Sequence, residues 1–82
     1  VMAYVEVFAA LADPTRGQVL EALRRQPKTV SEVAAGLPVS RTAVWQHLNV
    51  LESAGLVSVE PQGSRRFYLI KRDGLDDLRQ CL

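Results

Sequence analysis

The chain has 82 residues, 48% hydrophobic and 23% charged, a composition that predicts one soluble globular domain and excludes a disordered or membrane-spanning chain. A single cysteine excludes an internal disulfide and a multi-cysteine metal site. The net charge is only +1, but residues 14–72 carry nine Lys or Arg against four Glu, a local net charge of +5 that suits an anionic polymer.

Two helices are predicted at the start of the chain. Residues 3–12 place Val5 and Phe8 at helical spacing among small apolar residues, so this helix has an apolar stripe that needs a partner. The opening stretch has no basic residue and does not resemble a secretory signal, so we expect a cytoplasmic location. Asp13 then caps a second helix that runs to about Arg25.

A short helix, a tight turn and a longer helix are predicted next. Thr29 stands three residues before Glu32, the spacing of a capping box that opens the short helix. After a Gly and Pro turn, Ser40 is a suitable N-cap for the longer helix, expected over residues 41–54, and Gly55 suits its C-terminus. This order predicts a helix-turn-helix, whose second helix is offered to the DNA major groove.

The longer helix has two different faces. At 100° per residue, Val44, Leu48 and Leu51 form one apolar stripe that faces a core. His47 lies on the flank of this stripe, and we interpret it as a packing residue at the edge of the core. The opposite face, called here the reading face, consists of Arg41, Thr42, Trp45, Gln46 and Asn49. Its polar groups and its large aromatic side chain are available for contact with bases and phosphates.

Residues 57–71 predict a β-hairpin. Alternating apolar residues are followed by turn chemistry at 61–64 and by a segment rich in aromatic and β-branched residues. Arg65 and Arg66 stand beside the turn, as expected of a projection along a phosphate backbone. Adjacent residues of a strand point to opposite sides, so at least one of the two should face outward. The domain is therefore predicted to be a winged helix.

A fifth helix is predicted at about 74–82. Leu75, Leu78 and Leu82 stand at helical spacing and form a second apolar stripe that needs a partner. Cys81, near the end of this helix, is interpreted as a small buried hydrophobic residue.

The sequence resembles the ArsR-type winged helix-turn-helix transcriptional regulators. The motifs are LADPTRGQVLEAL from Leu11, the pair His47 and Leu48, AGLV from Ala54, and Gly63 with Arg65 and Arg66. The resemblance covers nearly the whole chain and implies one domain over 1–82, mainly α with a small β hairpin (α+β), with five helices and a two-stranded wing. It also implies a homodimer held by the terminal helices, at about 3–12 and 74–82, through Val5, Phe8, Leu75, Leu78 and Leu82.

The same resemblance bears on metal binding. Metal-sensing members carry a cysteine pair in the short helix, where this chain has residues 31–34 (SEVA), or paired Asp and His ligands on the final helix. Here Asp76 and Asp77 are adjacent and no histidine follows them. The resemblance therefore implies a non-metal-sensing member with no metal site and no cofactor, whose inducer is unknown.

These observations predict a sequence-specific regulator that binds double-stranded DNA, a homodimeric repressor at an inverted-repeat operator. Trp45 and Gln46 are expected to contact bases, while the remaining members of the site contact bases or phosphates and fix the register: Ser40, Arg41, Thr42, Asn49, Arg65 and Arg66. Where this chain has Trp45 and Asn49, family members commonly have a small polar residue and Lys. These departures of the chain from the family pattern bear on the operator sequence and on the contact from position 49.

No nucleophile stands with a base and an orienting group, so we expect a non-enzyme. Two alternatives remain open. One is a winged-helix protein-interaction module without DNA specificity of its own. The other is a metal-responsive repressor with an atypical site.

Overall fold

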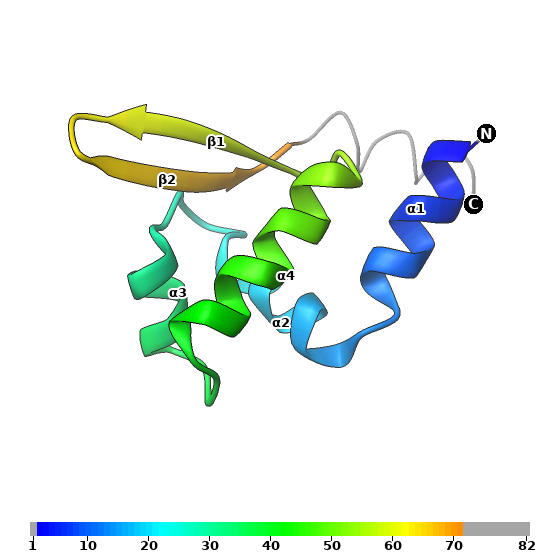
Figure 1. The fold of residues 1–82 in the computed structure, drawn as a ribbon, viewed down its shortest axis with the longest axis horizontal. Helices are drawn as coiled ribbons and strands as arrows, with labels where there is room; N and C mark the ends of the chain where they lie inside the picture. The colour runs from blue at the N-terminus through cyan, green and yellow to red at the C-terminus, as the bar shows by residue number, and fades with distance from the viewer. Residues whose placement is uncertain (1, 72–82) are drawn as a thin grey trace.

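Four helices and a two-stranded hairpin make up residues 2–71, the part of the chain that the computed structural model describes. In order they are α1 (Met2–Leu11), α2 (Pro14–Ala22), α3 (Val30–Ala35), α4 (Arg41–Ser53), β1 (Val57–Gln62) and β2 (Arg65–Ile70) (Figure 1). The predicted mainly helical fold with a two-stranded wing is confirmed. The fifth predicted helix, with Leu75, Leu78 and Leu82, lies outside the described residues.

Side-chain caps start the three helices that follow α1. The Asp13 carboxylate accepts a hydrogen bond from the backbone N–H two residues on, at 2.8 Å. Thr29 and Glu32 form the predicted reciprocal capping box, with N···O distances of 2.9 and 3.2 Å. The Ser40 hydroxyl accepts from the backbone N–H three residues on, at 3.1 Å. First-turn N–H groups have no partner within a helix, so these caps place the helix starts.

α2 ends three residues before the predicted Arg25. Its last turn tightens because the N–H groups of Leu23 and Arg24 bond to carbonyls three residues back, both at 3.1 Å, which closes 3₁₀-type turns. Leu23 is buried in the core. Pro27 follows, and it disfavours a helical conformation for the residue before it.

The core joins α2, α3, α4 and the base of the wing, with one residue from α1. The predicted stripe of Val44, Leu48 and Leu51 is fully buried and faces this core. The other buried residues are Ala10, Val19, Leu23, Val33, Leu56, Val57 and Tyr68. One face of α4 is therefore packed in the core, and its opposite face is available for other contacts.

The wing is an antiparallel hairpin whose turn is shorter than predicted. β1 and β2 pair from Val57 opposite Ile70 to Gln62 opposite Arg65, so only residues 63 and 64 form the loop. Pro61, predicted in the turn, lies in β1, where a strand with one unpaired edge tolerates a residue without an N–H. Gly63 has a φ of 62°, as two-residue hairpin loops require.

The base of the wing is held from both sides. Lys28, in the loop between α2 and α3, exchanges two backbone hydrogen bonds with Tyr68 of β2, at 3.0 and 2.8 Å. The N–H of Lys71 donates to the carbonyl of Leu56 at 2.8 Å. These bonds leave the tip of the wing to extend beyond the helices (Figure 1).

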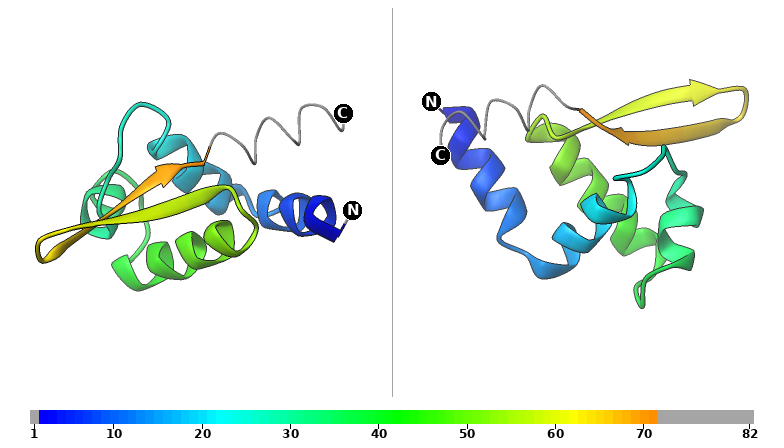
Figure 2. Two further views of the ribbon diagram at one scale, coloured as in Figure 1. Left: turned by 90° about the horizontal axis from the view of Figure 1, so that it is seen from above. Right: turned by 180° about the vertical axis from the view of Figure 1, so that it is seen from behind.

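α1 and the wing tip lie at opposite ends of the molecule (Figure 1 and Figure 2). Val5 and Phe8 of α1 are 62% and 46% exposed, whereas Ala10 is buried against the core. The apolar stripe predicted for this helix therefore faces outward in a single chain. No helix in the described part of the chain is long and apolar enough to cross a membrane.

Candidate nucleic-acid interface

The reading face of α4 lies opposite its buried stripe. Arg41, Thr42 and Gln46 are exposed and Trp45 is 49% exposed. Asn49 is half-buried, so it is less accessible than the helical wheel predicted and less accessible than the other members of this face. Ser40, also exposed, stands at the start of this face and caps the helix.

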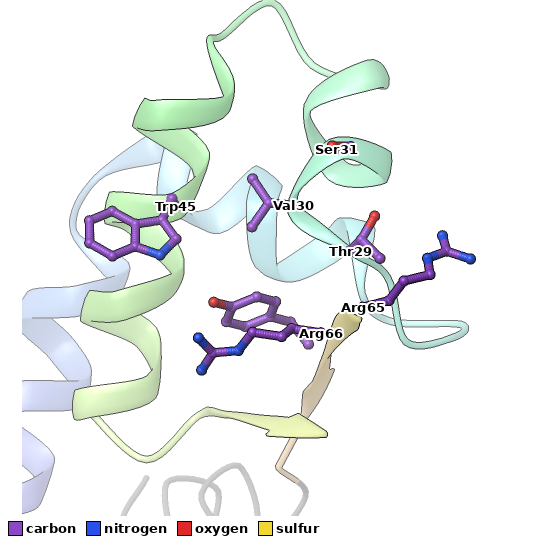
Figure 3. Close-up of a pocket in the computed structure, with 7 residues that line it drawn as sticks. Thr29, Val30, Ser31, Trp45, Arg65 and Arg66 are labelled. Carbon is purple, nitrogen blue, oxygen red and sulfur yellow. The ribbon is translucent and has the colours of Figure 1, made fainter. Parts of the chain in front are cut away.

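The wing and the reading face meet in one shallow hollow of about 360 Å³. Three elements line it, the start of α3, the middle of α4 and β2 (Figure 3). The lining residues are Thr29, Val30, Ser31, Trp45, Arg65, Arg66 and Tyr68. The structure therefore brings Trp45 together with both wing arginines, although these lie 20 and 21 residues later in the sequence.

The two arginines leave β2 in different directions. Arg66 extends toward the α4 side of the hollow, and Arg65 lies on the side of Thr29 (Figure 3). The Arg65 guanidinium carbon lies 5.0 Å from the centre of the Phe67 ring, a cation–π arrangement between neighbours on one face of the strand. This contact holds the guanidinium over a ring face and leaves its N–H groups free to donate to phosphate.

Arg41 has a partner within the fold. Its Nη1 donates to the Ser31 hydroxyl at 3.3 Å, which joins the start of α4 to α3. A guanidinium has five N–H donors, so most of them remain for a phosphate or a base. Sequence reasoning missed Ser31, whose only signal was its place in the first turn of α3.

The electrostatics of this region favour an anionic partner. Within residues 2–71 the ion pairs are Arg16 with Asp13 and Arg24 with Glu21, and neither uses an arginine of the reading face or the wing. No carboxylate is among the described residues that line the hollow, and Glu32, next to Ser31 in the sequence, lines a separate hollow. A hydrogen bond from the backbone N–H of Thr29 lowers the pKa of Glu32, and the charge of Arg65 contributes further, so this carboxylate stays ionised at neutral pH.

His47, which we interpreted from the sequence as a packing residue at the edge of the core, also makes a polar contact. It is half-buried, and its Nδ1 accepts a hydrogen bond from Nε of Arg16, which lies 31 residues earlier in α2, at 3.4 Å. The spacing of the two residues in the sequence does not indicate this polar contact. Among the residues that the structure describes, no group of three or more His, Cys, Asp or Glu is placed to hold a metal ion.

A short helix, a turn, a longer helix with an exposed polar face and an arginine-tipped hairpin define a winged helix-turn-helix DNA-binding domain. Residues 13–59 match the family described as bacterial regulatory protein, arsR family. The chain belongs to this ArsR family and is a transcriptional regulator, as its sequence motifs predicted.

Related proteins agree with this assignment. The chain is 51% identical over 75 residues to the HTH-type transcriptional regulator Rv2034 of Mycobacterium tuberculosis. This alignment covers 92% of the chain and 70% of Rv2034. It superposes on an ArsR-like transcriptional regulator from Rhodococcus sp. RHA1 with a TM-score of 0.92 at 37% identity, over 99% of this chain and 76% of that one.

A third similar protein is the homodimeric winged helix-turn-helix DNA-binding domain Mb0332 from Mycobacterium bovis, a possible ArsR-family transcriptional regulator. The TM-score is 0.84 at 28% identity, over 96% of this chain and 74% of that one. These similarities confirm the predicted family and fold.

Proposed function

We propose that the chain is a homodimeric repressor that binds an inverted-repeat operator in double-stranded DNA through α4 and the wing. The observation that carries this proposal is the shared hollow, in which the exposed face of α4 adjoins both wing arginines. A helix in the major groove with a basic hairpin beside it contacts bases and flanking phosphates at once. The buried stripe of α4 supports this use, because it leaves the reading face without a role in the core.

The roles of the individual side chains follow from their chemistry. Gln46 can pair with N6 and N7 of adenine, and the edge of the Trp45 indole can pack against a thymine methyl group. Thr42 lies on the same exposed face and can reach either a base or a phosphate. The half-buried amide of Asn49 is assigned a weaker contact.

The phosphate contacts are assigned to the ends of this surface. Ser40 and Arg41 stand at the N-terminus of α4, where unpaired N–H groups and the helix dipole also favour an anion. Arg65 and Arg66 supply the contacts from the wing. Phosphate contacts set the register on the duplex and carry no direct sequence information.

Dimerisation is supported by the homodimeric Mb0332 domain, and the exposed side chains of Val5 and Phe8 support α1 as part of the interface. α1 lies at the far end of the molecule from the wing tip, so pairing there leaves both reading faces open (Figure 2). Leu75, Leu78 and Leu82 are proposed to complete this interface. Two copies would then read half-sites about 34–36 Å apart, one turn of the duplex.

The proposed dimer regulates by binding alone. It covers operator DNA in the cytoplasm and thereby excludes other proteins from that stretch of promoter. This mechanism needs no cofactor and no catalytic step. Derepression would need a ligand that favours a dimer geometry with a mismatched half-site spacing.

Selection of bound duplexes from a random DNA pool tests the DNA-binding part of the proposal. We expect an enriched inverted repeat whose half-sites are about 10 base pairs apart, centre to centre. Binding to nonspecific duplex should also weaken steeply with salt, because several cations displace counterions. A flat salt dependence together with no enriched sequence would instead indicate a protein-interaction module.

Analytical ultracentrifugation of Phe8→Glu tests the dimer. The new charge should prevent burial of this face and shift the protein toward the monomer. Gln26→Glu adds the same charge at an exposed loop position and should leave the dimer intact. Equal sedimentation of the two variants would contradict an interface at α1.

A further inference from the structure

The C-terminal end of α1 packs against the core. Among the α1 side chains that the structure describes, Ala10 is buried and Leu11 is half-buried, while Val5 and Phe8 point outward. A buried alanine contributes one methyl group, so it specifies the angle of a helix poorly compared with a large interlocking side chain. The Ala10 contact therefore leaves the angle of α1 to be set by further contacts, and directional polar contacts at this end of the helix can supply them.

One guanidinium joins α1 to two other helices. Arg16, in the first turn of α2, uses Nη1 to donate to the carbonyls of Ala10 and Ala9, at 3.2 and 3.5 Å, in the last turns of α1. Its Nε donates to Nδ1 of His47 in the middle of α4, at 3.4 Å. Its Nη2 lies 4.0 Å from Oδ2 of Asp13, the cap of its own helix.

The environment of Arg16 strengthens these contacts. The side chain is only 18% exposed, so water competes less for its donors than at the surface. Carbonyls at the end of a helix lack partners within it and carry the negative end of the helix dipole, which attracts a cation. A planar guanidinium donates in fixed directions, so it constrains the orientation of the groups it joins as well as their distance.

We propose that Arg16 is a positioning residue for operator binding, which sets the angle between α1 and α4 by bonding to both helices. This inference rests on the proposed function, in which α1 pairs the two copies and α4 reads the DNA. In such a dimer the angle between these helices decides how far apart the two reading faces lie.

A small change of this angle has a large effect on the spacing. α4 has 13 residues and is therefore about 20 Å long. Over a lever of that length, a rotation of about 10° moves the far end by about 3.5 Å, close to the rise of about 3.4 Å per base pair. Losing the Arg16 contacts should therefore loosen the requirement for one half-site spacing.

The test uses variants that cut the contacts from either side. Arg16→Met keeps a long unbranched side chain but removes every donor. His47→Leu removes the acceptor on α4 and leaves the bonds from Arg16 to α1 in place, and it serves as the second variant if Arg16→Met does not fold. Arg24→Met is the matched control, because it removes an exposed arginine just after α2 whose ion pair is with Glu21, three residues earlier in the chain.

Affinities are measured for the selected inverted repeat, for the same repeat with one base pair added or removed between half-sites, and for a single half-site. The affinity of wild type and of Arg24→Met should fall about tenfold or more when one base pair is added or removed between the half-sites. At the optimal spacing, Arg16→Met should bind about tenfold more weakly than wild type, which is the scale of one charge-assisted hydrogen bond. Its affinity should change little when the spacing is altered. Its affinity for the single half-site should stay as in wild type.

Other outcomes separate the two proposals. If Arg16→Met weakens every duplex by the same factor, or discriminates spacings as wild type does, the positioning role of Arg16 is overturned and the function stands. If wild type itself shows no spacing preference, the inverted-repeat function fails and the positioning role fails with it.

Amide hydrogen exchange checks the contact itself without DNA. Arg16→Met should speed exchange in α1 by about tenfold relative to α4, because the last turn of α1 loses its bond to the rest of the domain. Unchanged exchange in α1 would overturn the inference, whatever the binding data show.

Discussion

Replacing both wing arginines with alanine gives the most direct test of how the wing is used. Arg65 and Arg66 are exposed, and Arg65 makes one contact with the Phe67 ring. Within residues 2–71 neither belongs to an ion pair, so the double substitution should change the stability of the fold by less than about 1 kcal/mol. Its main effect should therefore be on DNA affinity.

The magnitude follows from the number of cations at the interface. The proposed interface has three cations in each copy and six in a homodimer, namely Arg41, Arg65 and Arg66 of both copies. Each phosphate neutralised contributes about −0.9 to the slope of log K against log salt, so wild type should have a slope of about −5 and the variant about −2. Between about 50 and 200 mM salt, wild type should lose roughly 10³ in affinity and the variant about tenfold.

Fluorescence anisotropy with a labelled operator and with a scrambled duplex of equal length measures these slopes. The matched control is the double change Arg24→Ala and Arg25→Ala, which removes the same charge at two exposed positions after α2. The wing variant should weaken both duplexes alike, and the control should keep the wild-type slope. A wing variant that keeps the wild-type slope, or a control variant that flattens the slope equally, would contradict phosphate binding by the wing arginines.

Three further predictions concern base reading, the core and acid stability. Gln46→Ala should lower discrimination at one base position by about 1–3 kcal/mol, seen as similar affinities for operators that differ only there; equal discrimination in both proteins would contradict base contact. Leu48→Ala should reduce the free energy of unfolding in urea by about 2–5 kcal/mol, because Leu48 is fully buried, and a smaller loss would mean that the core relaxes around the cavity. Hydrogen bonds from backbone N–H groups, the largest cause in each case, lower the pKa values of Asp13 and Glu32. Carboxyls with lowered folded pKa values stabilise the fold above their unfolded pKa of about 4 and lose this effect as the pH falls through the folded values. The urea concentration at the midpoint of unfolding should therefore fall as the pH is lowered below about 4. The double variant Asp13→Asn and Glu32→Gln should show a smaller fall.

Local sequence determined where the helices begin and which face of α4 is buried. The caps at Asp13, Thr29 and Ser40 act over two or three residues, so the spacing of side chains along the chain is enough to identify them. The buried stripe of α4 follows from helical periodicity alone. The family resemblance was also carried by motifs of this kind, and the match over residues 13–59 confirmed it.

Element ends were predicted less well because they depend on contacts with the rest of the fold. The end of α2 is set by burial of Leu23 and by tightening of the last turn, which the helical pattern through Arg25 does not show. Pro61 looks like a turn residue in isolation. Pairing with β2 nevertheless keeps it in β1, because the other edge of that strand has no partner.

Only the tertiary structure decided which distant groups meet. Lys28 pairs with the middle of β2, Trp45 shares a hollow with the wing arginines, and Arg16 bonds to His47 across 31 residues. No periodicity or spacing encodes such contacts, since they depend on how the helices pack around one core. The sequence by itself therefore determined the elements and the family, whereas packing determined the surface offered to DNA and the polar contact that joins α1 to α4.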